Sequence, residues 1–191
     1  MIRVARNMLL NQLRMVRDRV VPEQIAARFD DCRSGPRALT RLSKNCRLQF
    51  GKHVTIGAYT VITGWPEDIA GPRPAATLEV GDYTYFGKLN NIRVAGITRI
   101  EAKCQISQGV SIIGSNHSQI PGIPIIDQPS RTDKVGVAIE DDVWIGANST
   151  ILASVTIASA STVATGNVVT RDVPPNVVVA GVSARVLKDR K

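Results

Sequence analysis

Aliphatic residues recur at every sixth position along the C-terminal half of the chain. From Ile139 the sequence reads IEDDVW, IGANST, ILASVT, IASAST, VATGNV and VTRDV, and each of these segments begins with Ile or Val. An α-helix, with 3.6 residues per turn, would spread such positions around its axis. In a solenoid of short β segments, each aliphatic side chain instead stacks on its counterpart one coil away. The pattern therefore predicts a repeat of hexads, which are six-residue β segments.

The same spacing of six recurs upstream in three groups of three hexads. The groups begin with Phe50, Ile56 and Ile62, with Val80, Phe86 and Ile92, and with Ile100, Ile106 and Ile112. If three hexads make one triangular coil, the chain forms about five coils. Each interruption, at residues 64–77, 96–99 and 115–137, follows the third hexad of a group. We therefore expect all the insertions to leave the prism at the same corner.

The N-terminal part of the chain follows a helical pattern instead. Leu9, Leu13, Val16 and Val20 have helical spacing, with arginines mostly off that face. The predicted fold is thus an all-β solenoid with three parts: a basic helical N-terminal cap (residues 1–45), a left-handed β-helix (46–172) with inserted loops 64–77 and 115–137, and a C-terminal extension (173–191). No apolar run approaches 18 residues, so we expect neither a signal peptide nor a membrane span.

Charge and cysteine content narrow the classes of function. Residues 1–47 carry eleven Lys/Arg against four Asp/Glu, which accounts for +7 of the chain's net charge of +8. The body has no zinc-ligand spacing and no aromatic-basic string, which argues against nucleic-acid binding. The basic N-terminal helix either caps the solenoid or also makes a peripheral contact with anionic membrane. Three cysteines without a CxxC spacing favour a reducing, cytoplasmic location and predict no metal site.

The hexads, the stretches IEDDVWIGANSTIL and VVTRDVPPNVVVAGVSARVLK, and a histidine at the start of the long insertion carry a family resemblance. Over about residues 46–190 the chain resembles the left-handed β-helix, hexapeptide-repeat acyltransferases. It is most similar to the galactoside, maltose, xenobiotic and polysaccharide O-acetyltransferases. The resemblance implies a homotrimer that binds acetyl-CoA between neighbouring prisms and transfers the acetyl group directly to a hydroxyl or amine.

A candidate catalytic base lies at the start of the longest insertion. A sugar hydroxyl is a poor nucleophile near neutral pH, and the pKa of histidine suits removal of its proton during attack on a thioester. The chain has two histidines. His53 is the fourth residue of its hexad, which indicates a surface position. His117 directly follows the last regular hexad, where the resemblance implies the catalytic base. The alternative is a loop histidine that fixes the turn through the backbone.

Asn90 is the candidate acceptor-binding residue. The resemblance implies an asparagine close to the acceptor hydroxyl near this position, with Asn91 as the fallback because of the slip at residues 96–99. The alternative comes from the hexad itself. Asn90 occupies the fifth position, like Asn167 in the later repeat, and a residue there can stack in an internal amide ladder. The sequence leaves both interpretations open.

The resemblance also implies the contacts with acetyl-CoA. Matching the motifs from Trp144 onward places six residues at the cofactor: Ala147, Thr165, Thr170, Arg171, Arg185 and Lys188. Pantetheine would lie near the first two, and the phosphates would face the basic residues. Ser154 and Ala158 stand where this family commonly has glycine. We therefore expect negative φ angles at these two positions.

The predicted activity is acetyl-CoA-dependent O-acetylation of a sugar or surface polysaccharide. Three alternatives stay open: N-acetylation of an amino-sugar nucleotide, acetylation of serine, and a non-enzymatic basic β-solenoid that docks on anionic membrane. ISQGVSIIG is similar to a stretch of the serine acetyltransferases, but the glycine-rich GDRHP context of their histidine is absent.

Overall fold

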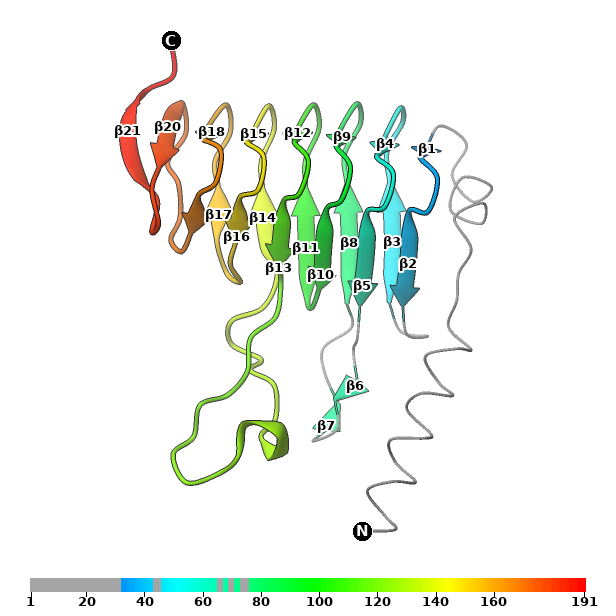
Figure 1. Ribbon diagram of the computed structural model, residues 1–191, viewed down its shortest axis with the longest axis vertical. Coiled ribbons are helices and arrows are strands. Elements are labelled where there is room, and N and C mark those ends of the chain that lie inside the picture. The colour runs from blue at the N-terminus through cyan, green and yellow to red at the C-terminus, as the bar shows by residue number, and fades with distance from the viewer. Residues whose placement is uncertain (1–31, 43–45, 65–66, 69–70, 73–75) are drawn as a thin grey trace.

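Short parallel strands wind into a three-walled prism (Figure 1). The computed structural model describes residues 32–42, 46–64, 67–68, 71–72 and 76–191. In these residues the helical content is a single 3₁₀ turn, η1 (Ile125–Asp127), and no helix is long and apolar enough to cross a membrane. The parallel walls, the scarcity of helix and the hexad pattern fit the left-handed β-helix that the sequence predicts.

Each wall of the prism is one sheet. The eight-stranded sheet contains, in spatial order, β1 (Arg33–Ser34), β4 (Thr55–Ile56), β9 (Tyr85–Phe86), β12 (Gln105–Ile106), β15 (Trp144–Ile145), β18 (Thr162–Val163), β20 (Val177–Ala180) and β21 (Arg185–Asp189). The six-stranded sheet contains β19 (Val168–Val169), β16 (Thr150–Ile151), β13 (Ser111–Ile113), β10 (Asn91–Val94), β5 (Val61–Gly64) and β2 (Leu39–Leu42). The five-stranded sheet contains β17 (Thr156–Ile157), β14 (Val137–Ile139), β11 (Ile97–Ile100), β8 (Thr77–Val80) and β3 (Arg47–Phe50).

The strand register confirms the predicted stacking of the aliphatic residues. In the eight-stranded sheet Ile56 pairs with Phe86, Phe86 with Ile106, and Ile106 with Ile145. The other two walls stack their aliphatic residues in the same way. Together these columns form one buried core along the axis of the prism. Burial of each such side chain stabilises the fold by roughly 1.5–3 kcal/mol.

The prism begins earlier than predicted. Strand β1 pairs in parallel with β4, and β2 pairs with β5, although both lie inside the predicted cap at residues 1–45. The inward position of β2 is occupied by Thr40, which is buried without a strong apolar signal. A pattern search for aliphatic residues therefore misses this coil. Residues 1–31, which carry the predicted helix and its membrane contact, lie outside the described residues.

The prism also ends later than predicted. Val173, the first residue of the predicted extension, forms a parallel bridge with Ile157, and β20 continues the eight-stranded sheet beside β18. The chain then reverses, and β21 pairs antiparallel with β20. This reversal blocks further parallel pairing at the end of the prism. The described solenoid thus comprises the five predicted coils with additional strands at both ends.

All the insertions leave from one corner, as predicted. Each lies between a strand of the six-stranded sheet and the following strand of the five-stranded sheet. The first contains a small hairpin of β6 (Glu67–Asp68) and β7 (Gly71–Pro72). The longest connects β13 to β14 and projects from the same edge of the prism (Figure 1). We call residues 114–136 the arm.

The turns between walls rely on left-handed backbone. At the fourth hexad position Ser154 has φ 65°, Ala160 has φ 56° and Asn148 has φ 57°. The expectation of a negative φ at Ser154 is therefore wrong, whereas Ala158 is not among the residues with positive φ. The turn needs one left-handed residue to redirect the chain, and the core on both sides compensates for its strain.

Ala160→Gly is expected to raise the free energy of unfolding by about 0.5–1 kcal/mol. An L-residue in left-handed backbone costs about 1–2 kcal/mol. Glycine avoids this cost, and the free energy gained exceeds the penalty from the additional conformational entropy that glycine loses on folding. Urea unfolding followed by circular dichroism measures the change. The matched control is Ala102→Gly, in a turn position without positive φ, which is expected to destabilise by a similar amount. A loss of stability in both variants would contradict the prediction.

Candidate active site

The arm is anchored to the prism at both of its ends. The Gly114 N–H donates to the Arg93 carbonyl oxygen at 2.8 Å, and the Gly136 N–H donates to the Gly114 carbonyl oxygen at 2.8 Å. Gly136 has φ 75°, and a β-carbon there would lie 2.1 Å from the Ile97 carbonyl oxygen. Only glycine allows this approach. The root of the arm is thus held in place by the wall.

His117 lies in this root and is exposed to solvent. Its backbone forms an antiparallel bridge with Ser130 on the returning segment, and its N–H donates to Asn116 Oδ1 at 2.9 Å. The Asn116 carbonyl oxygen accepts the Arg131 N–H at 3.1 Å. Both the outgoing and the returning segments therefore fix the backbone of His117.

A two-pronged ion pair stiffens the returning segment. Arg131 Nε donates to Asp133 Oδ1 at 2.9 Å, and Arg131 Nη2 donates to Oδ2 at 2.5 Å. The hydrogen bond from Arg131 lowers the pKa of the Asp133 carboxyl to about 2. Because this pKa is lowered, the stability that the ion pair adds is fully present above the ordinary carboxyl pKa. It is lost as the pH falls toward 2. At neutral pH the pair is therefore ionised.

Gln128 organises the outer part of the arm. Its side chain is buried and accepts the Ile120 N–H at 2.7 Å through Oε1. Its Nε2 donates to the carbonyl oxygens of Ile120 at 3.1 Å and Ile123 at 2.6 Å. The isoleucines of the arm meanwhile point outward, and Ile126 is 70% exposed. The arm therefore has a polar interior and an apolar surface, and no period in the sequence indicates either feature.

Asn90 lies inside the prism, in the position that the internal-ladder alternative expects. The side chain is 1% exposed, its Nδ2 donates to the Gly87 carbonyl oxygen at 2.9 Å, and its Oδ1 accepts the Val110 N–H at 2.8 Å. Asn167 repeats these bonds three coils away, with Ala164 and Gly181. The fifth hexad position thus points inward at this corner and satisfies backbone groups. Asn91, the fallback, is exposed on β10.

Asn90→Ala is expected to destabilise the protein by about 1–3 kcal/mol, because it leaves the buried Val110 N–H without its acceptor. The acceptor KM is expected to stay unchanged. Urea unfolding and steady-state kinetics measure the two effects. Asn91→Ala is the matched control, with a change in stability below about 0.5 kcal/mol. A raised KM with unchanged stability in Asn90→Ala would restore the acceptor-binding assignment.

Two of the predicted cofactor residues lie at one corner, one coil apart. The Gly166 N–H donates to the Ala147 carbonyl oxygen at 2.8 Å, and Gly146 lies directly beneath Thr165. A β-carbon at Gly146 would approach the Thr165 nitrogen to 2.6 Å. Ala147 is half-buried and Thr165 is exposed. This corner therefore presents small side chains to solvent.

The other predicted cofactor residues lie near the C-terminal end of the prism. The Thr170 and Ser183 hydroxyls are hydrogen-bonded, and Arg185 Nη1 donates to Ser183 Oγ at 3.1 Å. Arg171 follows Thr170 and is exposed. Lys188 is also exposed and lies on β21 opposite Val178. The structure thus brings Thr170 and Arg185 together through Ser183.

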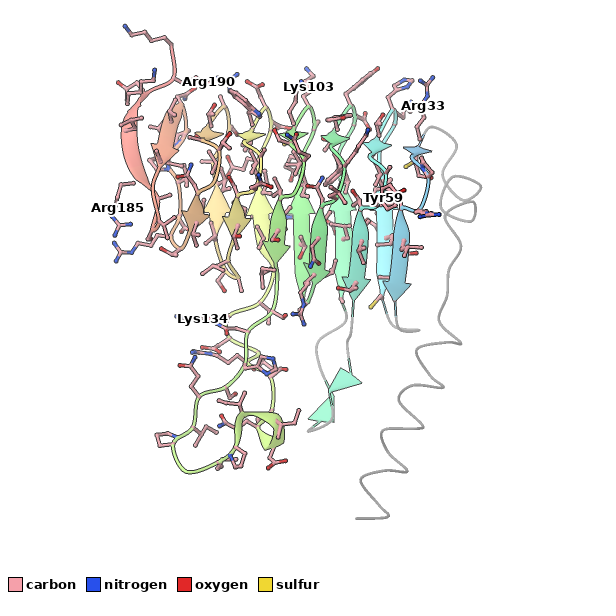
Figure 2. All side chains as sticks on the ribbon, viewed as in Figure 1. Arg33, Tyr59, Lys103, Lys134, Arg185 and Arg190 are labelled. Atoms are coloured by element: carbon pink, nitrogen blue, oxygen red, sulfur yellow. The ribbon has the colours of Figure 1, made fainter. Side chains whose placement is uncertain are left out.

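Thr170 and Arg171 lie along the same edge of the prism as His117. Thr170 and Arg171 follow β19, and His117 follows β13, which is two strands away in the same sheet. Strands stack about 4.8 Å apart, so the two sites are separated by roughly 10 Å along the axis. Figure 2 shows Arg185 on the edge that faces the arm, whereas Arg190 lies on the opposite edge. An elongated ligand could therefore follow this edge.

The Cys104 side chain is buried in the prism. Burial raises the pKa of the Cys104 thiol to about 11, and this thiol donates to the Glu140 carbonyl oxygen at 3.0 Å. Cys104 is therefore protonated at neutral pH and unsuited to nucleophilic attack. Within the part of the chain that the structure describes, no three His, Cys, Asp or Glu residues gather as a metal site.

Sequence comparison finds related repeats and enzymes. Residues 136–171 match the family described as the hexapeptide repeat of succinyl-transferase. A 2,3,4,5-tetrahydropyridine-2,6-dicarboxylate N-acetyltransferase of Alkaliphilus metalliredigens (strain QYMF) is 45% identical over 86 residues, which are 45% of this chain and 31% of the relative. The match thus spans less than a third of that relative's length.

Solved structures share the fold. A hexapeptide-repeat containing acetyltransferase from Vibrio cholerae O1 biovar eltor, complexed with acetyl coenzyme A, has a TM-score of 0.62 and 27% identity over 74% of this chain and 70% of its own. An N-acyltransferase from Bacillus cereus, in complex with dTDP and coenzyme A, has a TM-score of 0.63 and 18% identity over 91% of both chains. The chain therefore carries a hexapeptide repeat at residues 136–171 and shares its β-helix fold with acetyltransferases.

Proposed function

We propose that this protein is an acetyl-CoA-dependent O-acetyltransferase that acts on a sugar or a surface polysaccharide, with His117 as the general base. The observation that carries the proposal is the position of His117. It is exposed in a root whose backbone is held from both sides, on the edge that also carries Arg171. A base held by the wall and open to solvent suits attack of an acceptor on a thioester.

The proposed reaction is a direct transfer. His117 accepts the proton of the acceptor hydroxyl while the hydroxyl oxygen forms a bond to the thioester carbon. A backbone N–H can stabilise the resulting oxyanion without any side chain. When the tetrahedral intermediate collapses, the carbon–sulfur bond breaks, and the proton held by His117 passes to the coenzyme A thiolate. The net products are an acetylated acceptor and a free thiol.

The cofactor is proposed to lie against the six-stranded sheet, which has Ala147 and Thr165 along one edge and Arg171 along the other. Ala147 and Thr165 would line the pantetheine arm, because small side chains allow its amides to reach backbone groups. Arg171, Arg185 and Lys188 would face the phosphates, whose charges require cations. Acetyl-CoA and coenzyme A complexes of structures with this fold support this choice of co-substrate.

A homotrimer is proposed as the working assembly. The arm exposes four isoleucines, Ile120, Ile123, Ile125 and Ile126. An apolar surface of this kind on a projecting segment favours contact with another chain. A second prism would supply that contact and would close the cofactor groove beside His117. Sedimentation velocity tests this assembly, and a monomer at assay concentrations would contradict it.

N-acetylation is the second candidate. The name of the Alkaliphilus relative, an N-acetyltransferase, favours it. An amine that is protonated at neutral pH also needs a base before attack, so His117 would have a comparable role. The site as described accepts either chemistry, and the acceptor decides between them.

An acceptor screen tests the proposed function. Release of thiol from acetyl-CoA is measured with saccharides, nucleotide-linked amino sugars, serine and tetrahydrodipicolinate, each with and without enzyme. Saccharide-dependent release supports O-acetylation. Release with amines alone contradicts the O-acetyl proposal in favour of N-acetylation. No release with any acceptor would instead favour a non-enzymatic solenoid.

Arg185→Ala is expected to raise the KM for acetyl-CoA by about 10- to 100-fold, because a charged hydrogen bond to phosphate contributes about 1.5–3 kcal/mol. The kcat is expected to stay within about twofold, since the phosphates lie far from the reacting carbon. The matched control is Lys191→Ala, at the exposed end of the chain. Equal KM values for both variants would contradict the proposed placement of the phosphates.

A further inference from the structure

An exposed arginine lies beside the root of the arm. Arg93 is the third residue of β10, and its carbonyl oxygen accepts the Gly114 N–H at 2.8 Å. Its Cα pairs with that of Ile113, the last residue of β13 before the arm. The residues on both sides of Arg93 along β10 are buried, so its side chain points outward from the six-stranded sheet. The wall therefore holds this guanidinium group beside the segment that leads to His117.

The protein does not neutralise the charge of Arg93. None of the six strands of this sheet contains an Asp or a Glu. In the part of the chain that the structure describes, no ion pair or hydrogen bond reaches the Arg93 guanidinium. Arg99, an outward arginine on the next wall, instead donates to Glu79 at 2.7 Å and lies 3.7 Å from Glu101. Of these two wall arginines, Arg93 is therefore the one that can bind an external anion.

The acidic residues near this corner lie in the insertions rather than on the wall. Asp133 of the arm is bound to Arg131 at 2.5 Å, and Asp127 lies in η1, in the middle of the arm. Glu67 and Asp68 lie in β6, in the hairpin that precedes β8. The strands around Arg93 thus present its positive charge without a competing carboxylate.

The strand order places Arg93 on the acceptor side of the proposed site. In the six-stranded sheet β13 leads to His117, with β16 and β19 on one side and β10 and β5 on the other. The proposed cofactor residues Ala147, Thr165 and Arg171 adjoin β16 and β19. In a direct transfer the acceptor and the thioester meet at the base. The acceptor is therefore expected on the side that the cofactor leaves open, and that side begins with β10.

The surface around Arg93 offers hydrogen bonds as well as charge. Asn91 is exposed on the same face of β10, Thr63 lies beside Arg93 on β5, and Ser111 lies beside Asn91 on β13. Amide and hydroxyl groups can both donate to and accept from sugar hydroxyls. On the cofactor side of Arg93 the neighbouring residue is the apolar Ile113. The polar surface thus lies where the acceptor is expected.

The distance from Arg93 to the proposed base is short enough for one ligand to contact both. Gly114 and His117 are three residues apart, which is at most about 11 Å even in a fully extended chain. The Gly114 nitrogen is itself hydrogen-bonded to the backbone of Arg93. A saccharide can therefore contact the guanidinium group while one of its hydroxyls lies at His117.

We propose that Arg93 binds the anionic group of an acidic saccharide, so that the acceptor is a sugar that carries a carboxylate or a phosphate. This inference rests on the proposed function and narrows its class of acceptor. A guanidinium group binds either anion through two parallel hydrogen bonds. An acid group held at Arg93 leaves the hydroxyls of the same sugar free to approach His117.

The phosphates of the cofactor are the competing occupant. Strands β10 and β19 are three steps apart in the sheet, which is about 14 Å. This separation favours different anions at Arg93 and at Arg171. The two occupants also differ in kinetics, because loss of Arg93 would raise the KM of whichever substrate it binds.

Acceptors that differ only in the acid group test the proposal. Galacturonate and its oligomers are compared with their neutral methyl esters, and glucose 6-phosphate is compared with glucose. At least one acidic acceptor is expected to have a kcat/KM at least about tenfold above that of its neutral partner. Arg93→Ala is expected to raise the KM for that acceptor by about 10- to 100-fold and to leave the KM for acetyl-CoA unchanged. Arg93→Lys, which keeps the charge without the fork, is expected to recover part of this loss.

The matched control is Arg99→Ala, which is expected to keep the KM for both substrates within about twofold. Equal kcat/KM for acidic and neutral partners would overturn the proposal. So would an unchanged acceptor KM, or a raised KM for acetyl-CoA, in Arg93→Ala. Transfer to neutral sugars alone would keep the proposed function and refute this inference.

Calorimetry in the presence of coenzyme A separates the two proposals if no sugar is acetylated. Binding of galacturonate oligomers or glucose 6-phosphate that Arg93→Ala abolishes, and that Arg99→Ala leaves intact, would support the anion site although the proposed transfer fails. Absence of binding by every acidic sugar would overturn the inference.

Discussion

His117→Ala is expected to lower kcat by about 10²- to 10⁴-fold while leaving the fold and the KM for acetyl-CoA unchanged. General-base assistance contributes a factor of this size, because the acceptor hydroxyl is otherwise a poor nucleophile. The side chain is exposed and lies outside the core, so its removal costs little stability. Thiol release measured over a range of acceptor concentrations gives kcat and KM separately.

The control for this prediction lies in the same arm. Gln119→Ala removes an exposed polar side chain two residues beyond His117 and is expected to retain kcat within about twofold. This comparison separates loss of the base from a general disturbance of the arm. Near-normal turnover by His117→Ala would refute the catalytic assignment. An equal loss in both variants would point to the conformation of the arm.

Ile106→Ala is expected to lower the free energy of unfolding by about 2–5 kcal/mol. Ile106 is 0% exposed and stacks between Phe86 and Ile145 in the central column of the eight-stranded sheet. Truncation leaves a cavity that neighbouring coils cannot close, because hydrogen bonds fix their spacing. Urea unfolding followed by circular dichroism measures the loss.

Ile97→Ala is the matched control for the core substitution. Ile97 lies on β11 but is 57% exposed, so its truncation is expected to change stability by less than about 0.5 kcal/mol. Both variants shorten isoleucine to alanine, on the core face of a strand at Ile106 and on the solvent face at Ile97. Equal destabilisation would contradict the assignment of Ile106 to a continuous core.

The hexad period predicts the walls because residues six positions apart point into the core from successive walls. Ile100 and Ile139 each begin the first hexad of a group, on either side of the arm, and they do pair, in β11 and β14. The period also predicts the corner from which the arm leaves. It fails at the first coil, because Thr40 occupies a buried position without an aliphatic side chain.

The candidate site is predicted less completely. The break in the period after Ile112 indicates the root of the arm and hence His117. It carries no information about Gln128 or the pair Arg131 and Asp133, because these residues interact within a segment that has no repeat. The role of Asn90 is also ambiguous in the sequence, although the shared fifth position of Asn90 and Asn167 favours the internal alternative.

The sequence by itself thus determined the hexad repeat, the register of the walls and the common corner of the insertions. These follow from side chains that must face a core at fixed intervals. Only the tertiary structure decided that Asn90 turns inward, that Ser154 adopts left-handed backbone, and that Thr170 and His117 share one edge. Each of these depends on how neighbouring coils meet at a corner, and that contact joins residues far apart in the chain.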